Sequence, residues 1–345
     1  MFIGDVHFKV SNIPEVELFV ERVTAMAKER RPDIICIAGD VLDTHERLHT
    51  AVLNKAYDFI NKMREITTTY ILVGNHDMEN NMQFLTTNHW MNGMKEWNNV
   101  VIVDTVVVLD INSDKFVFVP YVTVGRFEEA LNTVEGWKEA SCIFAHQEFY
   151  GCKMGAIVSI EGDKWSLQYP SVVSGHIHSK QTIQENVYYS GSAMQHAFGE
   201  SEENIIAYFT FEGGKYEKEE VNLQLPRKKI VYMDVDDLDD YTLPDTDDKI
   251  KLTISGEYEQ FKALKKTKKY KNLVETGVKV VFKQKKAEVK KKVDSLKADV
   301  IEGIDFQDIL DKLVTEQADP FLYQTYQLII HGNEVETDSI MFIKK

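Results

Sequence analysis

Five short polar motifs, each placed where a short apolar segment ends, constrain this chain more than any other feature of its sequence. The apolar segments are short enough to be strands, and amphipathic segments of helical period alternate with them. Polar loops at the carboxyl ends of the strands of an α/β domain can meet in one place. The motifs are therefore predicted to form one site. They are Asp5-Val6-His7, Gly39-Asp40, Gly74-Asn75-His76-Asp77, Ala145-His146 and Gly175-His176-Ile177-His178.

Residues 1–226 are predicted to form one layered α/β domain. A helix is expected over Pro14–Arg30, because apolar side chains recur at helical spacing and a proline lies near its start. A hairpin is expected over residues 205–221, with Gly213-Gly214 in its turn. Strands are expected at Ile34–Ala38, Tyr70–Val73, Val117–Pro120, Cys142–Ala145, Ser171–Ser174 and Val187–Ser190.

The side chains in the motifs are those of an open catalytic metal site. Carboxylate, imidazole and amide donors without thiolates suit manganese, iron or zinc. A single histidine, or an isolated Gly-Asp turn, is more often structural than a ligand. Here five of the ten histidines fall inside the motifs, which favours the metal site. The histidines without such a context, which we interpret as structural or solvated, are His45, His49, His89 and His331.

In this order the motifs resemble those of the calcineurin-like metallophosphoesterases, over residues 1 to about 212. The resemblance implies a four-layer α/β fold, a β-sandwich flanked by helices. It also implies two divalent cations, with manganese as the expected metal. His76 would act on the substrate, and Asp77 would orient His76. The implied ligands are Asp5, His7 and His178 for the first cation, Asn75, His146 and His176 for the second, and Asp40 for both.

Finer features resemble the SbcD and MRE-eleven DNA nucleases of this family, including the compact phage recombination nucleases. Gly39–Asp43 resembles their Gly-Asp-aromatic-Asp loop, with Leu42 in the aromatic position. Gly191–Glu200 resembles their Gly-Ser-Pro…Phe-x-Glu loop, with Ala193 in place of proline. His196 in this loop would either contact a phosphate or be an ordinary loop histidine. The resemblance implies an exonuclease, an endonuclease or both, acting in DNA repair, recombination or replication.

The formal net charge of −15 is high for a DNA-binding protein, but the charge is unevenly distributed. Lys262–Lys297 contains 14 lysines against three acidic residues, a balance of +11, so the remainder of the chain carries −26. Eight aspartates lie in Asp234–Asp248, which suggests a boundary there. A lysine-rich face would bind DNA phosphates in a salt-dependent way, although a solvated helix would have the same composition.

Residues 227–300 are predicted to be a small α+β capping domain, which binds DNA in nucleases of the SbcD type. A strand is expected at Lys251–Ile254, a helix at Tyr258–Lys269 and a second strand at Val278–Phe282. Residues 301–345 are expected to be a C-terminal helical segment.

The resemblance also implies protein partners. An SbcC-like coiled-coil ATPase would bind the C-terminal segment, where an apolar stripe could contact it or pack in the core. A homodimer, within a heterotetramer with the ATPase, would form through helices beside the active site. Val52–Met63 and Met82–Met94 are the candidates, although core packing explains their composition equally well. The stripe consists of Phe306, Ile309, Leu310 and Leu313.

No apolar run reaches the roughly 18 residues that a membrane span needs. The three cysteines have no paired spacing, so we expect a reducing, cytoplasmic location, in the host if a phage encodes the chain.

Two alternatives to a nuclease stay open. One is an enzyme for a small phosphodiester, and the other is a non-catalytic scaffold with the same fold. The complete motif set argues against the scaffold, which has no need of these side chains.

Overall fold

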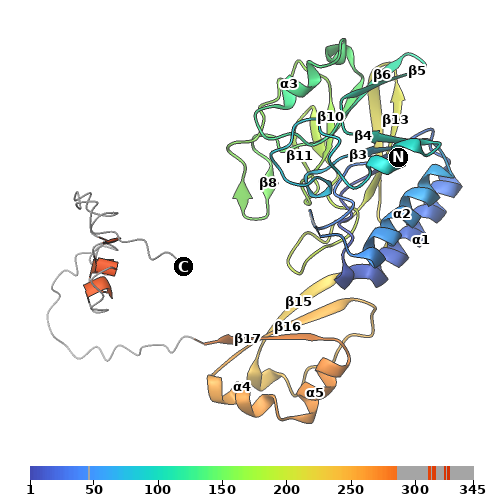
Figure 1. Ribbon diagram of the computed structural model, residues 1–345. Helices are drawn as coiled ribbons and strands as arrows, with labels where there is room; N and C mark the ends of the chain where they lie inside the picture. Colours follow the sequence, from blue (N-terminus) through green and yellow to red (C-terminus); the bar gives the residue numbers. More distant parts are fainter. Residues whose placement is uncertain (46, 286–309, 312, 316–321, 324, 327–345) are drawn as a thin grey trace. The chain divides into compact units, whose positions relative to one another are not determined.

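The computed structural model describes residues 1–45, 47–285, 310–311, 313–315, 322–323 and 325–326. Two six-stranded mixed sheets form the main domain, and helices flank them (Figure 1). This arrangement confirms the predicted α/β class. The first sheet has the order β14 (Lys215–Val221), β13 (Ile206–Glu212), β1 (Phe2–Ile3), β2 (Ile35–Ile37), β3 (Thr69–Leu72) and β4 (Val100–Val103). The second has the order β11 (Gln181–Gln184), β12 (Val187–Tyr189), β10 (Val172–Gly175), β7 (Cys142–His146), β6 (Asp114–Val119) and β5 (Val107–Ile111).

Side chains of the first sheet alternate between two apolar layers, because successive side chains of a strand point to opposite faces. In β2, Ile35 and Ile37 pack with residues of the two long helices α1 (Ile13–Arg30) and α2 (Thr50–Arg64). Cys36 lies between them in sequence and packs instead with residues of the second sheet. The layer between the sheets is rich in aromatic rings. The observed α1 begins one residue before the predicted helix and ends at the same residue.

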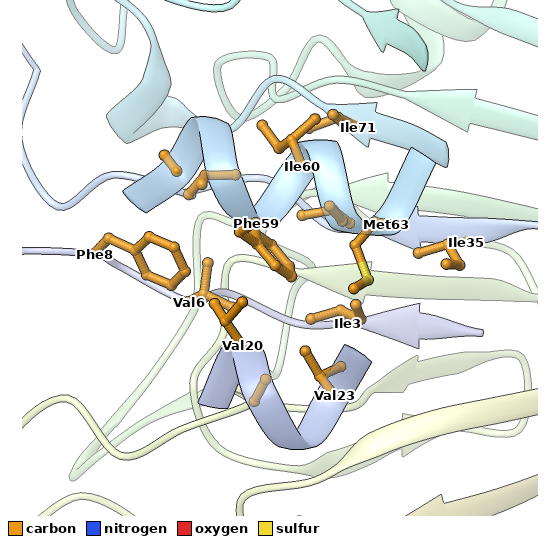
Figure 2. Packing of buried hydrophobic residues seen from close by; sticks show 14 of the residues in the cluster. Ile3, Val6, Phe8, Val20, Val23, Ile35, Phe59, Ile60, Met63 and Ile71 are labelled. Carbon is orange, nitrogen blue, oxygen red and sulfur yellow. The ribbon is translucent and has the colours of Figure 1, made fainter. Parts of the chain in front are cut away.

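Phe59 of α2 is fully buried in the layer between the helices and the first sheet. Its ring centroid lies 5.6 Å from that of Phe8 and 5.6 Å from that of Phe19. Figure 2 shows Val6 and Val20 on one side of the Phe59 ring. Phe8 directly follows the motif residue His7, so the packing of Phe59 also fixes the loop that carries this histidine.

Replacing Phe59 by alanine is expected to lower the free energy of unfolding by about 3–5 kcal/mol. The change loses the transfer free energy of a buried ring and leaves a cavity. Equilibrium denaturation in urea measures the effect. Lys62→Ala on the same helix, which removes only an exposed ion pair with Asp58, is the control and should cost less than about 0.5 kcal/mol. A loss below about 1 kcal/mol at Phe59 would contradict the packing described.

A third, parallel sheet follows, with the order β15 (Lys228–Asp234), β16 (Lys249–Gly256) and β17 (Lys279–Gln284). The helices α4 (Tyr258–Leu264) and α5 (Lys268–Glu275) pack against it and share a separate apolar core with it. The predicted single helix over Tyr258–Lys269 is wrong. Helix α4 ends at Leu264, and α5 begins after Thr267, whose hydroxyl accepts a hydrogen bond from the backbone N–H of Tyr270 at 3.2 Å. The domain boundaries at residues 226 and 300 remain predictions.

The expected helix over Met82–Met94 is also wrong. This segment forms turns, and only its end joins a 3-10 helix, η3 (Asn92–Glu96).

Phe306, Ile309 and His331 lie outside the described residues. The remaining short elements are α3 (Phe127–Leu131), β8 (Lys153–Met154), β9 (Ile157–Val158), η1 (Val10–Asn12), η2 (Asn75–Asp77), η4 (Trp137–Glu139) and η5 (Val235–Asp237). None of the helices in the described part of the chain has both the length and the hydropathy of a membrane span.

Candidate metal centre

The loops at the carboxyl ends of five strands bring the motif side chains together. Strands β1, β2 and β3 of the first sheet precede three of these loops, and β7 and β10 of the second sheet lead into the other two. All seven side chains expected to be ligands lie in one cluster, because each is within 3.6 Å of another member. Their role as ligands remains a prediction. The cluster consists of Asp5, His7, Asp40, Asn75, His146, His176 and His178.

Asp40 is at the centre of this cluster. Its Oδ2 atom lies 3.5 Å from Nε2 of His7 and 3.3 Å from Nε2 of His146. Its Oδ1 atom accepts a hydrogen bond from the backbone N–H of His76 at 2.8 Å. One carboxylate oxygen thus faces both halves of the cluster, as expected of a bridging ligand.

The other predicted ligands make contacts within the two expected groups, except Asp5, whose Oδ1 atom lies 3.6 Å from Nδ1 of His146 in the second group. In the first group, Nε2 of His7 lies 3.0 Å from Nε2 of His178. In the second group, Oδ1 of Asn75 lies 3.0 Å from Nε2 of His146 and 2.9 Å from Nδ1 of His176. Donor atoms from distant parts of the chain are therefore directed at one another within each group.

This set of donors fits divalent cations. Oδ2 of Asp5 is buried and has no hydrogen-bond partner in the described part of the protein. Burial lowers the pKa of His176 to about 3 and holds the pKa of His7 well below its ordinary value, so both imidazoles keep a lone pair at neutral pH. Neutral imidazoles beside buried carboxylates are the ligands that zinc, iron and manganese take in proteins.

The backbone around the ligands is strained. His7, Asp40 and His176 have φ angles of 40°, 47° and 75°, in the left-handed region that costs residues other than glycine free energy. The loops also approach each other closely, and a Cβ atom on Gly74 would lie 2.2 Å from Oδ1 of Asp40. The glycine in this motif is therefore needed for the two loops to touch.

His76 lies beside the predicted ligands and is partly exposed. Its Nδ1 atom is 2.9 Å from the carbonyl oxygen of Asp43, and its ring stacks on the ring of His45 with centroids 4.7 Å apart. His45 therefore lies next to the site, and its interpretation as structural or solvated remains a prediction. By contrast, His89 has a buried side chain and lies 3.1 Å from Oδ2 of Asp104, in a structural role.

Asp77 is buried, and its hydrogen bonds connect loops, so its role in orienting His76 remains a prediction. Its Oδ1 atom accepts a hydrogen bond from Nε1 of Trp90 at 2.8 Å, and its Oδ2 atom accepts one from the backbone N–H of Gly74 at 3.1 Å. Burial, together with the nearby Asp40 carboxylate, raises the pKa of Asp77 to about 7. The ring of His76 contacts Asp43 and His45, and its backbone N–H is bound by Asp40.

Two residues of the Gly191–Glu200 loop contact the centre, although neither was expected among its ligands. Glu200 lies 3.4 Å from Nδ1 of His178, and the ring of His196 is 4.8 Å from the ring of His7. The Phe-x-Glu element was the only signal for Glu200. For His196 the sequence left a phosphate contact and an ordinary loop histidine open.

Metal binding should depend on pH through His146. Burial lowers the pKa of this histidine, but the Asp40 carboxylate outweighs burial and the pKa is raised to about 9. Below that pH a cation must displace a proton from the ring. We therefore expect the affinity for Mn²⁺ to increase between pH 7 and 9, by about tenfold per pH unit for one released proton, and to level off above pH 9. Calorimetry in buffers of different ionisation enthalpy counts the protons, and no release at pH 7.5 would contradict this expectation.

A family model and several known proteins are similar to this chain. The family model described as calcineurin-like phosphoesterase matches residues 1–180. "Putative phosphoesterase 078R" of Invertebrate iridescent virus 3 is 48% identical over 325 residues, which cover 92% of this chain and 92% of that protein. "Putative phosphoesterase 244L" of Invertebrate iridescent virus 6 is 50% identical over 275 residues, which cover 78% of this chain and 97% of that protein. A solved structure of a hypothetical protein from Thermus thermophilus aligns with a TM-score of 0.35 at 14% identity, over 64% of this chain and 98% of that one.

Proposed function

The chain belongs to the calcineurin-like phosphoesterase family, and we propose that it is a DNA nuclease that uses two divalent cations to hydrolyse phosphodiester bonds. The ligand cluster around Asp40 supports the hydrolysis of a phosphate ester. The observation that favours DNA over a small phosphodiester is a set of exposed lysines on the third sheet and its helices.

The proposed ligand assignment follows the two groups of donors. Asp5, His7 and His178 hold the first cation, Asn75, His146 and His176 hold the second, and Asp40 holds both. Cations bound there neutralise the negative charge that develops on a phosphate and lower the pKa of bound water. The most exposed of the predicted ligands is His178, whose side chain is 35% exposed, while that of His146 is fully buried. The phosphate therefore approaches from the side of His178 and His76.

His76 acts on the substrate in this proposal. Its Nδ1 atom is engaged by the carbonyl oxygen of Asp43, so Nε2 is the ring atom that can reach the phosphate. In the imidazolium form, which keeps Nδ1–H on that carbonyl, the proton on Nε2 stabilises charge on a phosphate oxygen and can move to the departing oxygen of the ester, which leaves a neutral ring. His45 stacks on the same ring and limits its rotation.

Eight exposed lysines lie on α4, in the turn between α4 and α5, on α5, on β17 and at the end of β17. Lys262 pairs with Glu259, and Lys285 pairs with Asp234. Among the described residues, no ion pair holds the other six, so their charges repel one another unless an anion binds. A surface of this kind attracts the phosphates of a nucleic acid. The eight are Lys262, Lys265, Lys266, Lys268, Lys271, Lys279, Lys283 and Lys285.

Replacing four of the unpaired lysines by glutamine is expected to weaken DNA binding and its dependence on salt. Each lysine that neutralises a phosphate contributes about 0.9 to the slope of log K against log salt concentration, so the slope should decrease by up to about 3.6. Fluorescence anisotropy with labelled duplex DNA measures the slope. The hydrolysis of a generic phosphodiester should not change. The four residues are Lys265, Lys266, Lys268 and Lys271.

A second quadruple variant removes the same charge from exposed lysines of the main domain and serves as the control. Its slope should remain close to that of the wild type. Equal decreases in both variants would show that only net charge matters, and would contradict a DNA surface on the third sheet. The control residues are Lys28, Lys138, Lys164 and Lys215.

The proposed activity is tested by incubating linear duplex DNA with the protein and Mn²⁺, in parallel with a generic phosphodiester. If a coiled-coil ATPase is encoded beside the same gene, it is added in a second series. We expect DNA to be degraded, and the ATPase to increase the rate. Hydrolysis of the generic ester alone, under every condition, would refute the nuclease and favour an enzyme for a small phosphodiester.

We also propose that the protein works as a homodimer with such an ATPase. A group of partly exposed aromatic rings supports a contact at α2, since the ring of Tyr57 lies 6.0 Å from that of Trp90 and 5.9 Å from that of Trp97. Light scattering measures the mass in solution. The dimer would be refuted if the wild type has the mass of a single chain at micromolar concentration and a Tyr57→Glu variant has the same mass.

A further inference from the structure

His196 is held against the candidate metal centre by its own loop. Its backbone N–H and that of Ala197 donate hydrogen bonds to Oε2 of Glu200, each at 2.8 Å. The other carboxylate oxygen of Glu200 lies 3.4 Å from Nδ1 of His178. The same glutamate therefore fixes both the loop that carries His196 and a predicted ligand of the first cation. Such shared contacts are typical of the groups that orient metal ligands.

The two ring nitrogens of His196 have different surroundings. Nε2 lies 3.2 Å from the carbonyl oxygen of Asp5, which can only accept a hydrogen bond, so this nitrogen carries the proton. Nδ1 then has a lone pair, and it is buried with no hydrogen-bond partner in the described part of the protein. The residue as a whole is only 7% exposed. Histidines that bind metals commonly donate one ring N–H to a backbone carbonyl and present the other nitrogen to the ion.

Three imidazoles converge at this point. The ring of His196 lies 4.8 Å from the ring of His7 and 5.1 Å from that of His178, and those two rings are 4.8 Å apart. One nitrogen from each of the three lies within 4.8 Å of the other two, close enough for a single ion to contact all of them. A loop histidine without a ligand role would not need to place its ring beside the rings of two predicted metal ligands.

We propose that His196 is an additional ligand of the first cation, together with His7 and His178. This assignment rests on the two-cation centre proposed above and adds an eighth ligand to the seven of the family pattern. The first site then has three imidazoles, whereas the second has two, from His146 and His176. Imidazole suits zinc, iron, cobalt and nickel better than manganese. The first site is therefore the one with the stronger preference for these metals.

The assignment is tested by titrating the metal-free full chain with Co²⁺, followed by visible absorption and by calorimetry. The wild type should bind two equivalents. His196→Leu should bind the first equivalent about 10–100-fold more weakly, and its absorption bands should shift, because a nitrogen ligand is lost. His89→Gln, which alters a buried histidine outside the centre, should leave both affinities unchanged. Circular dichroism of the metal-free variants verifies that they are folded.

A measurement on the wild type keeps the assignment testable if His196→Leu fails to fold. Proton NMR with one equivalent of Co²⁺ should give hyperfine-shifted, exchangeable N–H signals from three imidazoles. N–H signals from only two imidazoles, or unchanged affinity and absorption in His196→Leu, would overturn the proposal that His196 is a ligand. Either result would leave the two-cation centre itself intact. If the wild type binds no Co²⁺ at all, the centre itself and the proposed function fail with it.

Discussion

His76→Asn is expected to bind two cations as tightly as the wild type and to lose about 10²–10⁴ of its turnover on DNA. Positioned proton donors contribute a factor of this size to the rate. Asparagine cannot supply a proton to the departing oxygen, yet it removes none of the seven predicted ligands. Single-turnover rates on a labelled duplex measure the loss, and metal analysis after gel filtration measures the cations. His49→Asn, which alters the histidine that caps α2, is the control for a general effect of losing an imidazole.

This variant also decides between two roles for His76. One of its ring nitrogens lies within 4.8 Å of donor atoms from His7 and Asp40, so geometry alone would also allow it to bind a cation. However, the contacts with Asp43 and His45 hold the ring beside the predicted ligands, as a group that meets the substrate requires. If His76→Asn loses a cation along with its activity, the residue is a ligand and its role as a proton donor is wrong.

Asp40→Asn is expected to lose both cations and to reduce turnover on the order of 10³-fold or more, since removal of a single group that stabilises charge in the transition state already costs 10²–10³. Asp40 is the carboxylate that faces both His7 and His146, and asparagine keeps its shape but removes its charge. Calorimetric titration with Mn²⁺ should show no binding at micromolar concentration. Asp110→Asn, at an exposed carboxylate of β5, should behave as the wild type. Retention of both cations by Asp40→Asn would remove Asp40 from the bridging role.

The sequence was sufficient to predict which side chains meet, because the motifs follow strands of two sheets whose carboxyl ends lie together. It did not predict the local geometry. His7 and His176 adopt left-handed φ angles, which no residue type in their motifs indicates. Local preference disfavours this conformation, so only the packing of several loops against one another can impose it.

Residues without a motif show where sequence reasoning ends. His45 has no pattern around it, and for His196 the resemblance of its loop left two roles open. Both lie beside the centre because distant loops fold next to them. Met82–Met94 is apolar enough for a buried helix, yet it forms turns, since its apolar residues lack a sustained helical period. The division of the predicted helix at Thr267 depends on one capping hydroxyl, a signal that is weak when several lysines surround it.

The most direct measurement of the two-cation centre is anomalous diffraction from a crystal soaked in Mn²⁺. We predict two anomalous peaks about 3.5–4 Å apart, one on each side of the Asp40 carboxylate, with the two groups of donors around them. No peak, one peak, or peaks away from Asp40 would contradict the ligand assignment and the chemistry proposed from it.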